Sequence, residues 1–295
     1  TCVNSLYIAE NSLGNPPTTM LKWSPNGSTT TLGSVSLRSD AIAATADYES
    51  YIFSVDSGGS TGALRVFNTQ TGAWLAGSPG PGTTSPPTGV TGTIYALGFA
   101  PDGTLYAVTT TGVVWYLNKS DITSLVGGTS VQWKLGASLT GDLYEYSASS
   151  WRTSSPLRGI DLAFDGAGTM YLMTNYNRSA YIVTIPGTVL KTPGTYLSPR
   201  TSNYSIGSVT NASNDLRSLA FVGGVLYYSN TNVLRTIAWK TPVTTTSPPT
   251  MSTALAPATG YSVANNASDF ASCSYPSKTD PPSGLGFRVQ KSVVN

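Results

Sequence analysis

The sequence predicts an all-β protein with the architecture of a β-propeller, in which five blades are favoured and six are the alternative. Its apolar segments are short, rich in β-branched and aromatic residues, and bounded by Gly, Pro, Asn and Asp, as strands are. A unit built from these segments recurs at intervals of about 40–60 residues. The strand that the first unit lacks reappears near the C-terminal end. A β-sandwich with the same number of strands remains the alternative fold.

Most units begin with an apolar strand of small residues that ends in a turn, which suits the innermost position, where blades converge. These inner strands lie at residues 42–44, 97–103, 162–166 and 219–224. The strands that follow them lie at residues 5–8, 50–53, 104–107, 169–172 and 225–228. After a polar turn comes a third set, at residues 20–23, 63–67, 113–117, 180–184 and 233–237, and then a weaker strand. A degenerate extra blade around residues 144–151 or 196–208 would raise the number to six.

The first unit has no room for an inner strand, because Leu6 lies too close to the N-terminus. Residues 269–273 match the missing strand, and propellers close their ring by completing the first blade in this way. Cys273 would then end the inner strand and Cys2 would precede the next one, so we predict a disulfide between them. On the chain-entropy model, closing so long a loop contributes up to about 5 kcal/mol. Two unrelated buried thiols are the alternative.

The composition excludes several classes of function. Charged residues make up 10% of the 295 residues, the net charge is +2, and there is no histidine. A net charge this small does not provide the basic surface that binds nucleic acid. No apolar run is long enough for a membrane helix. Ser-His-Asp chemistry and the usual zinc sites cannot be assembled, and we expect no metal, no cofactor and no enzymatic activity. Two cysteines and the low charge indicate an extracellular protein, and the start at Thr1 is typical of a mature form without its signal peptide.

Six Asn-x-Ser sequences are candidate glycosylation sites, although this much serine produces several by chance. They begin at Asn26, Asn118, Asn177, Asn203, Asn211 and Asn266.

Four carboxylates and six tryptophans are the remaining candidates for chemistry or binding. Pairs of carboxylates support glycosidase reactions without histidine, and the candidates near the starts of inner strands are Asp40, Asp161, Asp215 and Asp269. The simpler interpretation, which we favour, is that they bond backbone amides there, so no catalytic residue is predicted. Tryptophans offer platforms for sugar rings, but packing between blades explains them first. They are Trp23, Trp74, Trp115, Trp133, Trp151 and Trp239.

The chain divides into a propeller (residues 1–276), a linker (277–284) and a C-terminal strand (285–295). The last segment alternates, with Phe287, Val289, Lys291 and Val293 on one face. The blade pattern and the segment 269–276, DFASCSYP, resemble the propeller-like domains of bacterial cell-surface proteins. In that family a similar segment closes the propeller, and a Val-x-Lys-x-Val strand then opens an array of Ig-like repeats. The resemblance implies a location at the cell surface.

The departure from that family leads to the functional hypothesis. The sequence contains the opening strand, residues 287–293, but no following domain. An unpaired strand behind a linker suits addition to the sheet of another copy, and head-to-tail addition produces a filament. We therefore expect a structural subunit that binds copies of itself through Phe287, Val289, Lys291 and Val293. The tail packing on its own ring, and a monomeric adhesin or carbohydrate-binding propeller that recognises surface glycans, are the alternatives.

Overall fold

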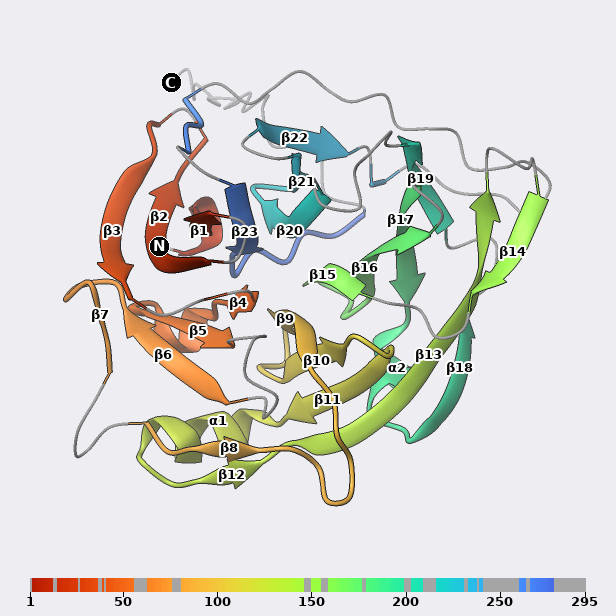
Figure 1. Ribbon diagram of the computed structural model, residues 1–295, viewed down its shortest axis with the longest axis horizontal. Helices are drawn as coiled ribbons and strands as arrows, with labels where there is room; N and C mark the ends of the chain where they lie inside the picture. Colours follow the sequence, from red (N-terminus) through yellow and green to blue (C-terminus); the bar gives the residue numbers. More distant parts are fainter. Residues whose placement is uncertain are drawn as a thin grey trace, which may run out of the picture.

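The computed structural model is a ring of β-sheets around a narrow central channel (Figure 1). Five of its sheets are the blades of a propeller, which confirms the predicted fold class and the favoured number of blades. The structure describes residues 2–12, 15–25, 27–36, 39, 41–55, 63–75, 81–145, 150–154, 159–176, 179–198, 203–208, 216–230, 233–237, 239–240, 260–263 and 266–278.

The strands of each blade run from the channel outward. Blade one contains β23 (Asn266–Ala271), β1 (Leu6–Ser12), β2 (Asn15–Trp23) and β3 (Thr30–Val35). Blade two contains β4 (Ala41–Ala43), β5 (Tyr51–Val55), β6 (Leu64–Asn68) and β7 (Ala73–Trp74). Blade three contains β9 (Ile94–Phe99), β10 (Leu105–Thr109), β11 (Val113–Leu117) and β13 (Lys134–Glu145). Blade four contains β15 (Gly159–Phe164), β16 (Met170–Tyr176), β17 (Ser179–Ile185) and β19 (Asn203–Ser208). Blade five contains β20 (Leu216–Val222), β21 (Val225–Asn230) and β22 (Val233–Ile237).

The ring closes at blade one, as predicted. Strand β23 pairs antiparallel with β1, and Ile8 lies opposite Phe270. Cys2 and Cys273 form a disulfide, with their Cα atoms 5.3 Å apart. The backbone N–H of Cys273 also donates to the carbonyl of Cys2, at 3.3 Å. The closing strand is therefore held to the N-terminal strand both by ladder hydrogen bonds and by a covalent bond.

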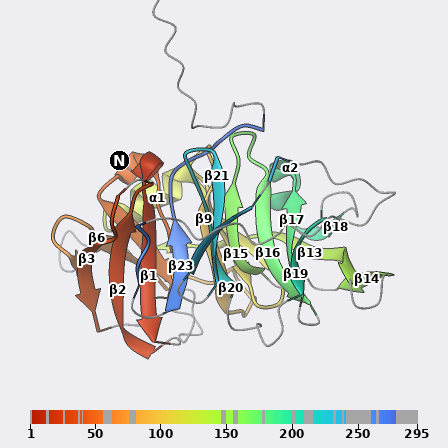
Figure 2. The same cartoon turned by 90° about the horizontal axis from the view of Figure 1, so that it is seen from above.

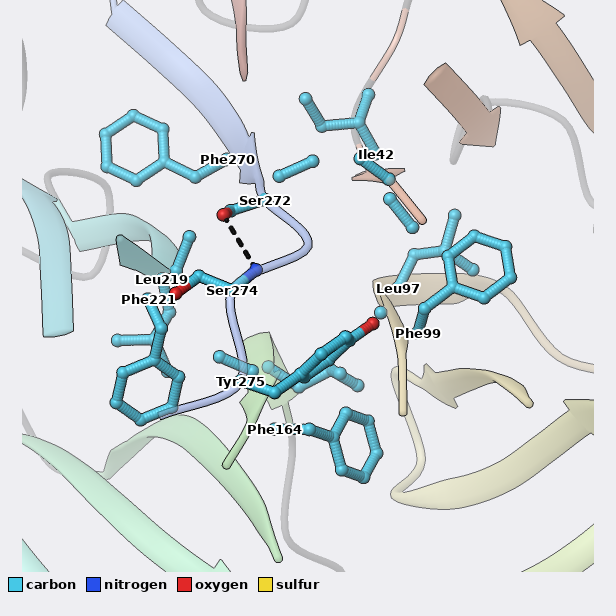
Figure 3. A pocket seen from close by; sticks show the side chains of 17 residues that line it. Ile42, Leu97, Phe99, Phe164, Leu219, Phe221, Phe270, Ser272, Ser274 and Tyr275 are labelled. Carbon is cyan, nitrogen blue, oxygen red and sulfur yellow. Dashed lines mark hydrogen bonds between the residues drawn. The ribbon is translucent and has the colours of Figure 1, made fainter. Parts of the chain in front are cut away.

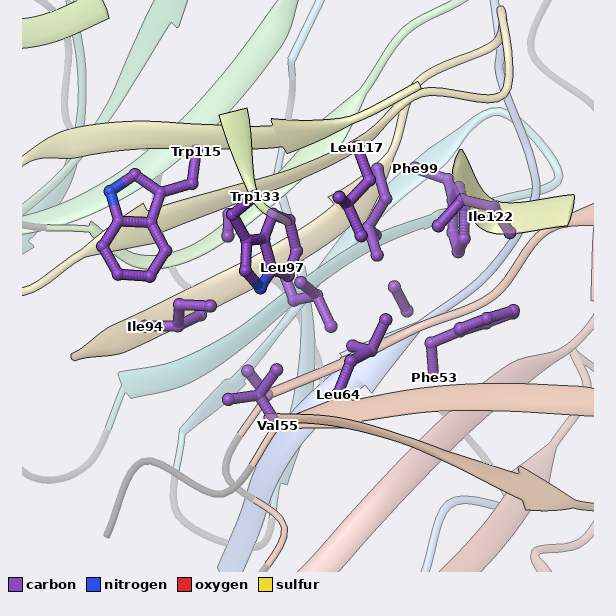
Figure 4. Close-up of a cluster of buried hydrophobic side chains, with 14 of the residues drawn as sticks. Phe53, Val55, Leu64, Ile94, Leu97, Phe99, Trp115, Leu117, Ile122 and Trp133 are labelled. Atoms are coloured by element: carbon purple, nitrogen blue, oxygen red, sulfur yellow. The ribbon is translucent and has the colours of Figure 1, made fainter. Parts of the chain in front are cut away.

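Five apolar clusters hold the blades together, one in each interface between neighbouring blades. Because each blade packs on both sides, successive residues of one strand enter different clusters. In β4, Ala41 and Ala43 face blade three, while Ile42 faces blade one. Large side chains fill these interfaces, as Phe53 and Trp115 do between blades two and three (Figure 4). The inner strands combine small residues such as Ala41 with large ones such as Phe221 and Phe270.

Blade three departs from the regular pattern. Strand β13 is 12 residues long, and its far part pairs with β14 (Ser150–Ser154) and β18 (Gly194–Ser198). Strand β19 is the outer strand of blade four. The segments that suggested a sixth blade therefore extend blades three and four, and the six-blade alternative is wrong.

Two short helices and a small parallel ladder complete the described chain. Helix α1 (Lys119–Val126) follows β11, and α2 (Gly187–Leu190) follows β17. The ladder joins β8 (Thr84–Ser85) to β12 (Val131–Gln132), and single 3₁₀ turns lie at Cys2–Asn4 and Ala46–Tyr48. Seen from the side, both helices and the N-terminal end lie toward one face of the disc, which we call the closure face (Figure 2).

Candidate functional site

The central channel is the first place to look for a site, because all five inner strands line it. The cavity has a volume of about 30 Å³, which is room for about one water molecule. Its wall is mostly apolar, and the ring of Tyr275 is one of the side chains that line it (Figure 3). The channel of this propeller is therefore filled by protein.

Residues 274–276, which follow the disulfide, fill the channel, and we call this segment the plug. The Ser274 N–H donates to Ser272 Oγ at 3.2 Å, and the Gly166 N–H donates to the Pro276 carbonyl at 2.8 Å. Burial raises the pKa of Tyr275, and its hydroxyl has no hydrogen-bond partner among the described residues. The ring of Tyr275 therefore contributes by filling space and not by a polar contact.

Two carboxyl groups from opposite parts of the sequence meet in the ring. Asp161 of β15 and Asp269 of β23 are 0% and 1% exposed, and their carboxyl groups lie close enough for each to shift the pKa of the other. Each also accepts a bond from the next blade. The Leu219 N–H of blade five donates to Asp161 Oδ2, and the Ile42 N–H of blade two donates to Asp269 Oδ2 at 2.5 Å. The pair thus links four of the five blades.

Burial favours the protonated form of both carboxyl groups. Two ionised carboxylates close together in a buried place would repel one another, which favours retention of a proton by the pair. Burial raises the pKa of Asp161 to about 8, against the lowering effect of Asp269 and of hydrogen bonds from the Leu219 and Leu162 N–H groups. Burial and then the charge of Asp161 raise the pKa of Asp269 well above its usual range. With both pKa values raised, the buried pair is neutral or singly charged at neutral pH.

Irregularities in the strand pairing orient the side chains of Asp161 and Asp269. The pairing of β15 with β16 shifts between Gly159 and Asp161, and the pairing of β23 with β1 shifts just before Asp269. Such bulges add one residue to a strand and redirect the side chains beside them. Ser268, at the second bulge, donates to the carbonyls of Ala9 and Ser39, both at 2.9 Å.

Of the four predicted carboxylates, the structure brings Asp161 and Asp269 together, and Asp40 and Asp215 lie outside the described residues. The simpler interpretation fits the described pair, because both bond backbone amides. Glycoside hydrolysis needs a sugar between two carboxyl groups, and these two contact one another inside the ring.

A larger cleft, which no sequence pattern predicted, opens between blades three and four. It has a volume of about 580 Å³ and is lined by turns of both blades, including Asp102, Tyr106 and Lys191. Lys191 Nζ donates to Thr104 Oγ1 at 2.9 Å and to Asn118 Oδ1 at 3.1 Å, and lies 3.7 Å from Asp102 Oδ2. The volume suits a small ligand, and the charged groups at its edge are already paired with one another.

The remaining predicted sites divide into three groups. Trp23, Trp115, Trp133 and Trp239 are buried in the blade interfaces, so they are not sugar platforms. Asn118 is the N-cap of α1, where it takes part in a capping box, and glycosylation there stays a prediction. The structure describes no side chain for Asn203, Asn266 or Trp151, and Asn26, Asn177, Asn211, Phe287, Val289, Lys291 and Val293 lie outside the described residues.

Within the described part of the chain, no three His, Cys, Asp or Glu side chains cluster as ligands of a metal ion. No helix among the described residues has the length and apolar character to cross a membrane.

No protein-family profile matches this chain, and no curated protein sequence matches it. Solved structures match at the level of the fold. A structural-genomics target assigned as a gluconolactonase is 10% identical, with a TM-score of 0.37, over 90% of this chain and 80% of its own. YCF48 bound to a D1 peptide is 9% identical, with a TM-score of 0.35, over 80% and 64% of the two chains. A protein of unknown function from Bacteroides thetaiotaomicron is 13% identical, with a TM-score of 0.39, over 77% of this chain and 54% of its own. At these identities and scores the likeness carries no information on activity.

Proposed function

We propose that this chain is a non-enzymatic, extracellular structural protein, a subunit of a bacterial surface filament that assembles head-to-tail by addition of its C-terminal strand. The observation that carries the proposal is the position of ring closure. Strand β23 and the Cys2–Cys273 bond complete blade one, and Tyr275 and Pro276 are fixed on the closure face. Residues 285–294, whose sequence alternates as a strand does, are not needed to close the ring.

Three further features support a structural role at the cell surface. The disulfide favours an oxidising compartment. The carboxyl pair is buried and bonded to backbone amides, which suits stability better than catalysis. Charged residues are 10% of the chain, so little charge has to be desolvated when copies pack together.

Deletion of residues 285–295 tests assembly. The full chain should form filaments in negative-stain images, and the deletion variant should remain monomeric with an unchanged melting temperature, because the ring closes without the tail. Filaments of the deletion variant would refute strand addition.

A matched pair of variants tests whether assembly depends on the apolar face of the tail strand or only on the length of the tail. Phe287→Ser with Val289→Ser changes one face of the predicted strand, and Arg288→Ser with Gln290→Ser changes the other. Only the first pair should abolish assembly, because the apolar face must pack. Equal assembly of both pairs would show that the predicted contact face is wrong.

Hydrolysis of any polysaccharide that is lost in Asp161→Asn would refute the non-enzymatic assignment.

The cleft between blades three and four favours one second candidate, a monomeric propeller that binds carbohydrate. Its volume of about 580 Å³ and its hydrogen-bonding edge suit a sugar unit. A glycan array tests this directly. The matched control is Lys134→Ala, at a partly exposed lysine that pairs with Asp121 of α1. Glycan binding that is lost in Lys191→Ala and retained in Lys134→Ala would support this candidate.

A further inference from the structure

The ring is complete at Cys273, and the chain then continues across the channel. Strand β23 ends at Ala271, and the disulfide joins Cys273 to Cys2 shortly after it. The Cys273 N–H and the Ser272 hydroxyl both donate to the Cys2 carbonyl, at 3.3 and 3.1 Å. None of these closing bonds involves a residue of the plug. The plug therefore begins where the closure of blade one ends.

The plug is held by a different set of contacts, at the turn between β15 and β16. The Pro276 carbonyl accepts the Gly166 N–H at 2.8 Å. A Cβ atom at Gly166 would lie 2.9 Å from the Tyr275 carbonyl oxygen, so the turn and the plug approach closely. Pro276 is buried, whereas Ser274 and Tyr275 are half-buried. These contacts can break while the bonds that close the ring stay intact.

The ring of Tyr275 supplies the apolar part of the contact. It packs on two of the interblade clusters, the one between blades three and four and the one between blades one and two. Phe99, Phe164 and Phe221, which belong to three different inner strands, line the channel with it (Figure 3). The closed plug is therefore stabilised mainly by burial of one aromatic ring.

The hydroxyl group of Tyr275 opposes the closed position. Its oxygen is buried and has no hydrogen-bond partner among the described residues. A hydroxyl that loses water without gaining a partner destabilises the state that buries it. Because this hydroxyl regains water when the plug leaves the channel, the closed plug carries a penalty that a phenylalanine would not have.

We infer that the plug opens and closes as a unit about Cys273 while the ring stays closed, and that it sets how far the following chain reaches from the closure face. Local openings of this kind involve segments with few buried contacts and leave the rest of a fold intact. Residues 274–278 span at most about 17 Å when extended, so an open plug lengthens the reach of the tail by up to that distance. The role of this reach in assembly rests on the proposed function, whereas the opening itself does not.

Residue-resolved hydrogen exchange of the full chain tests the opening. The Gly166 N–H donates to the plug and reports it directly. The Ile42 N–H donates to Asp269 of β23 and reports the closing strand. In the wild type, Gly166 should exchange through openings that leave Ile42 protected, because the plug opens without the ring.

Two substitutions of Tyr275 should shift the exchange of Gly166 in opposite directions. Tyr275→Phe removes the unpaired hydroxyl, so the exchange of Gly166 should slow by about threefold or more. Tyr275→Ala removes the ring, so the exchange should accelerate by about 30-fold or more. The matched control is the Gly168 N–H, which donates to the Asp165 carbonyl within the same turn and should keep its rate in both variants.

Three results would overturn the inference. Equal protection of Gly166 and Ile42 in the wild type would mean that the plug opens only together with the ring. An unchanged rate of Gly166 in Tyr275→Ala would mean that the plug does not protect this amide. Faster exchange in Tyr275→Phe would mean that the hydroxyl holds the plug closed.

The rate of filament growth, followed by light scattering, separates this inference from the proposed function. Tyr275→Ala should assemble faster than the wild type and Tyr275→Phe more slowly, because an open plug extends the tail. If exchange shows the opening but neither the wild type nor either variant forms filaments, the proposed function is wrong and the opening of the plug stands. Equal growth rates in the three proteins, with different exchange rates, would overturn the role of the plug in assembly.

Discussion

The carboxyl groups of Asp161 and Asp269 are buried close enough to shift one another's pKa, although they belong to blades four and one. Blade five separates these blades in the ring, so the contact crosses the centre of the propeller. Burial favours the protonated form of both groups, so the stability of the fold depends on pH.

The first prediction is that the protein loses stability as the pH rises from about 4 to about 8. Both groups have a higher pKa in the folded chain than in the unfolded chain, where an aspartate has a pKa of about 4. The folded state thus binds more protons in this range, and the free energy of unfolding falls by at most about 1.4 kcal/mol per pH unit for each group. The contribution is complete below pH about 4. Urea midpoints at pH 4, 6 and 8 measure it.

The absence of histidine makes the pH dependence of stability easier to assign to the aspartate pair. No side chain with an ordinary pKa titrates between pH 5 and 8 in a chain without histidine. Asp269→Asn can donate to Asp161 and accept from the Ile42 N–H, and it should reduce the pH slope. Asp102→Asn, at an exposed carboxylate, should leave the slope unchanged. An undiminished slope in Asp269→Asn would mean that another group causes the pH dependence.

A second prediction concerns the disulfide. Reduction of Cys2–Cys273, or the double variant Cys2→Ser with Cys273→Ser, should lower the free energy of unfolding by about 2–5 kcal/mol, because the bond joins residues 271 apart in sequence. Chemical denaturation with and without reductant measures the loss. The double serine variant should not respond to reductant, and equal stability of the oxidised and reduced wild type would contradict the prediction.

The plug gives a third prediction, with a built-in control. Tyr275→Phe removes a buried hydroxyl that has no partner among the described residues, so stability should be unchanged or slightly higher. Tyr275→Ala removes the ring that fills the channel and should cost about 2–4 kcal/mol. Thermal unfolding distinguishes them. A large loss in Tyr275→Phe would show that the hydroxyl makes an important bond.

A close approach of blades one and two gives a fourth prediction. A Cβ atom at Gly33 of β3 would lie 2.5 Å from the carbonyl oxygen of Gly72, so Gly33→Ala forces the backbone to move. The expected loss is about 1–3 kcal/mol in the free energy of unfolding. Ser34→Ala, at the exposed neighbouring position, should be neutral in the same denaturation experiment.

The sequence predicted the parts of this fold that depend on local pattern. Alternation and turn residues located the inner strands, and the position of Leu6 so near the N-terminus predicted the closing strand and the cysteine pair. Other features depend on contacts between distant residues. The bulges before Asp161 and Asp269 leave no mark in the spacing of apolar residues, so the sequence did not predict that these two carboxyl groups meet. The extension of β13 by β14 and β18 depends on such contacts too, so the sequence pattern left a sixth blade open as an alternative.

The position of the disulfide has a mechanical consequence. A pull on the tail beyond Lys278 is transmitted through Pro276 to Cys273, at the end of β23. Because Cys273 is bonded to Cys2, the load passes covalently to the start of the chain and does not peel β23 from β1 one hydrogen bond at a time. The seam where the two ends of the ring meet is therefore joined covalently, as the peptide chain joins the other neighbouring blades.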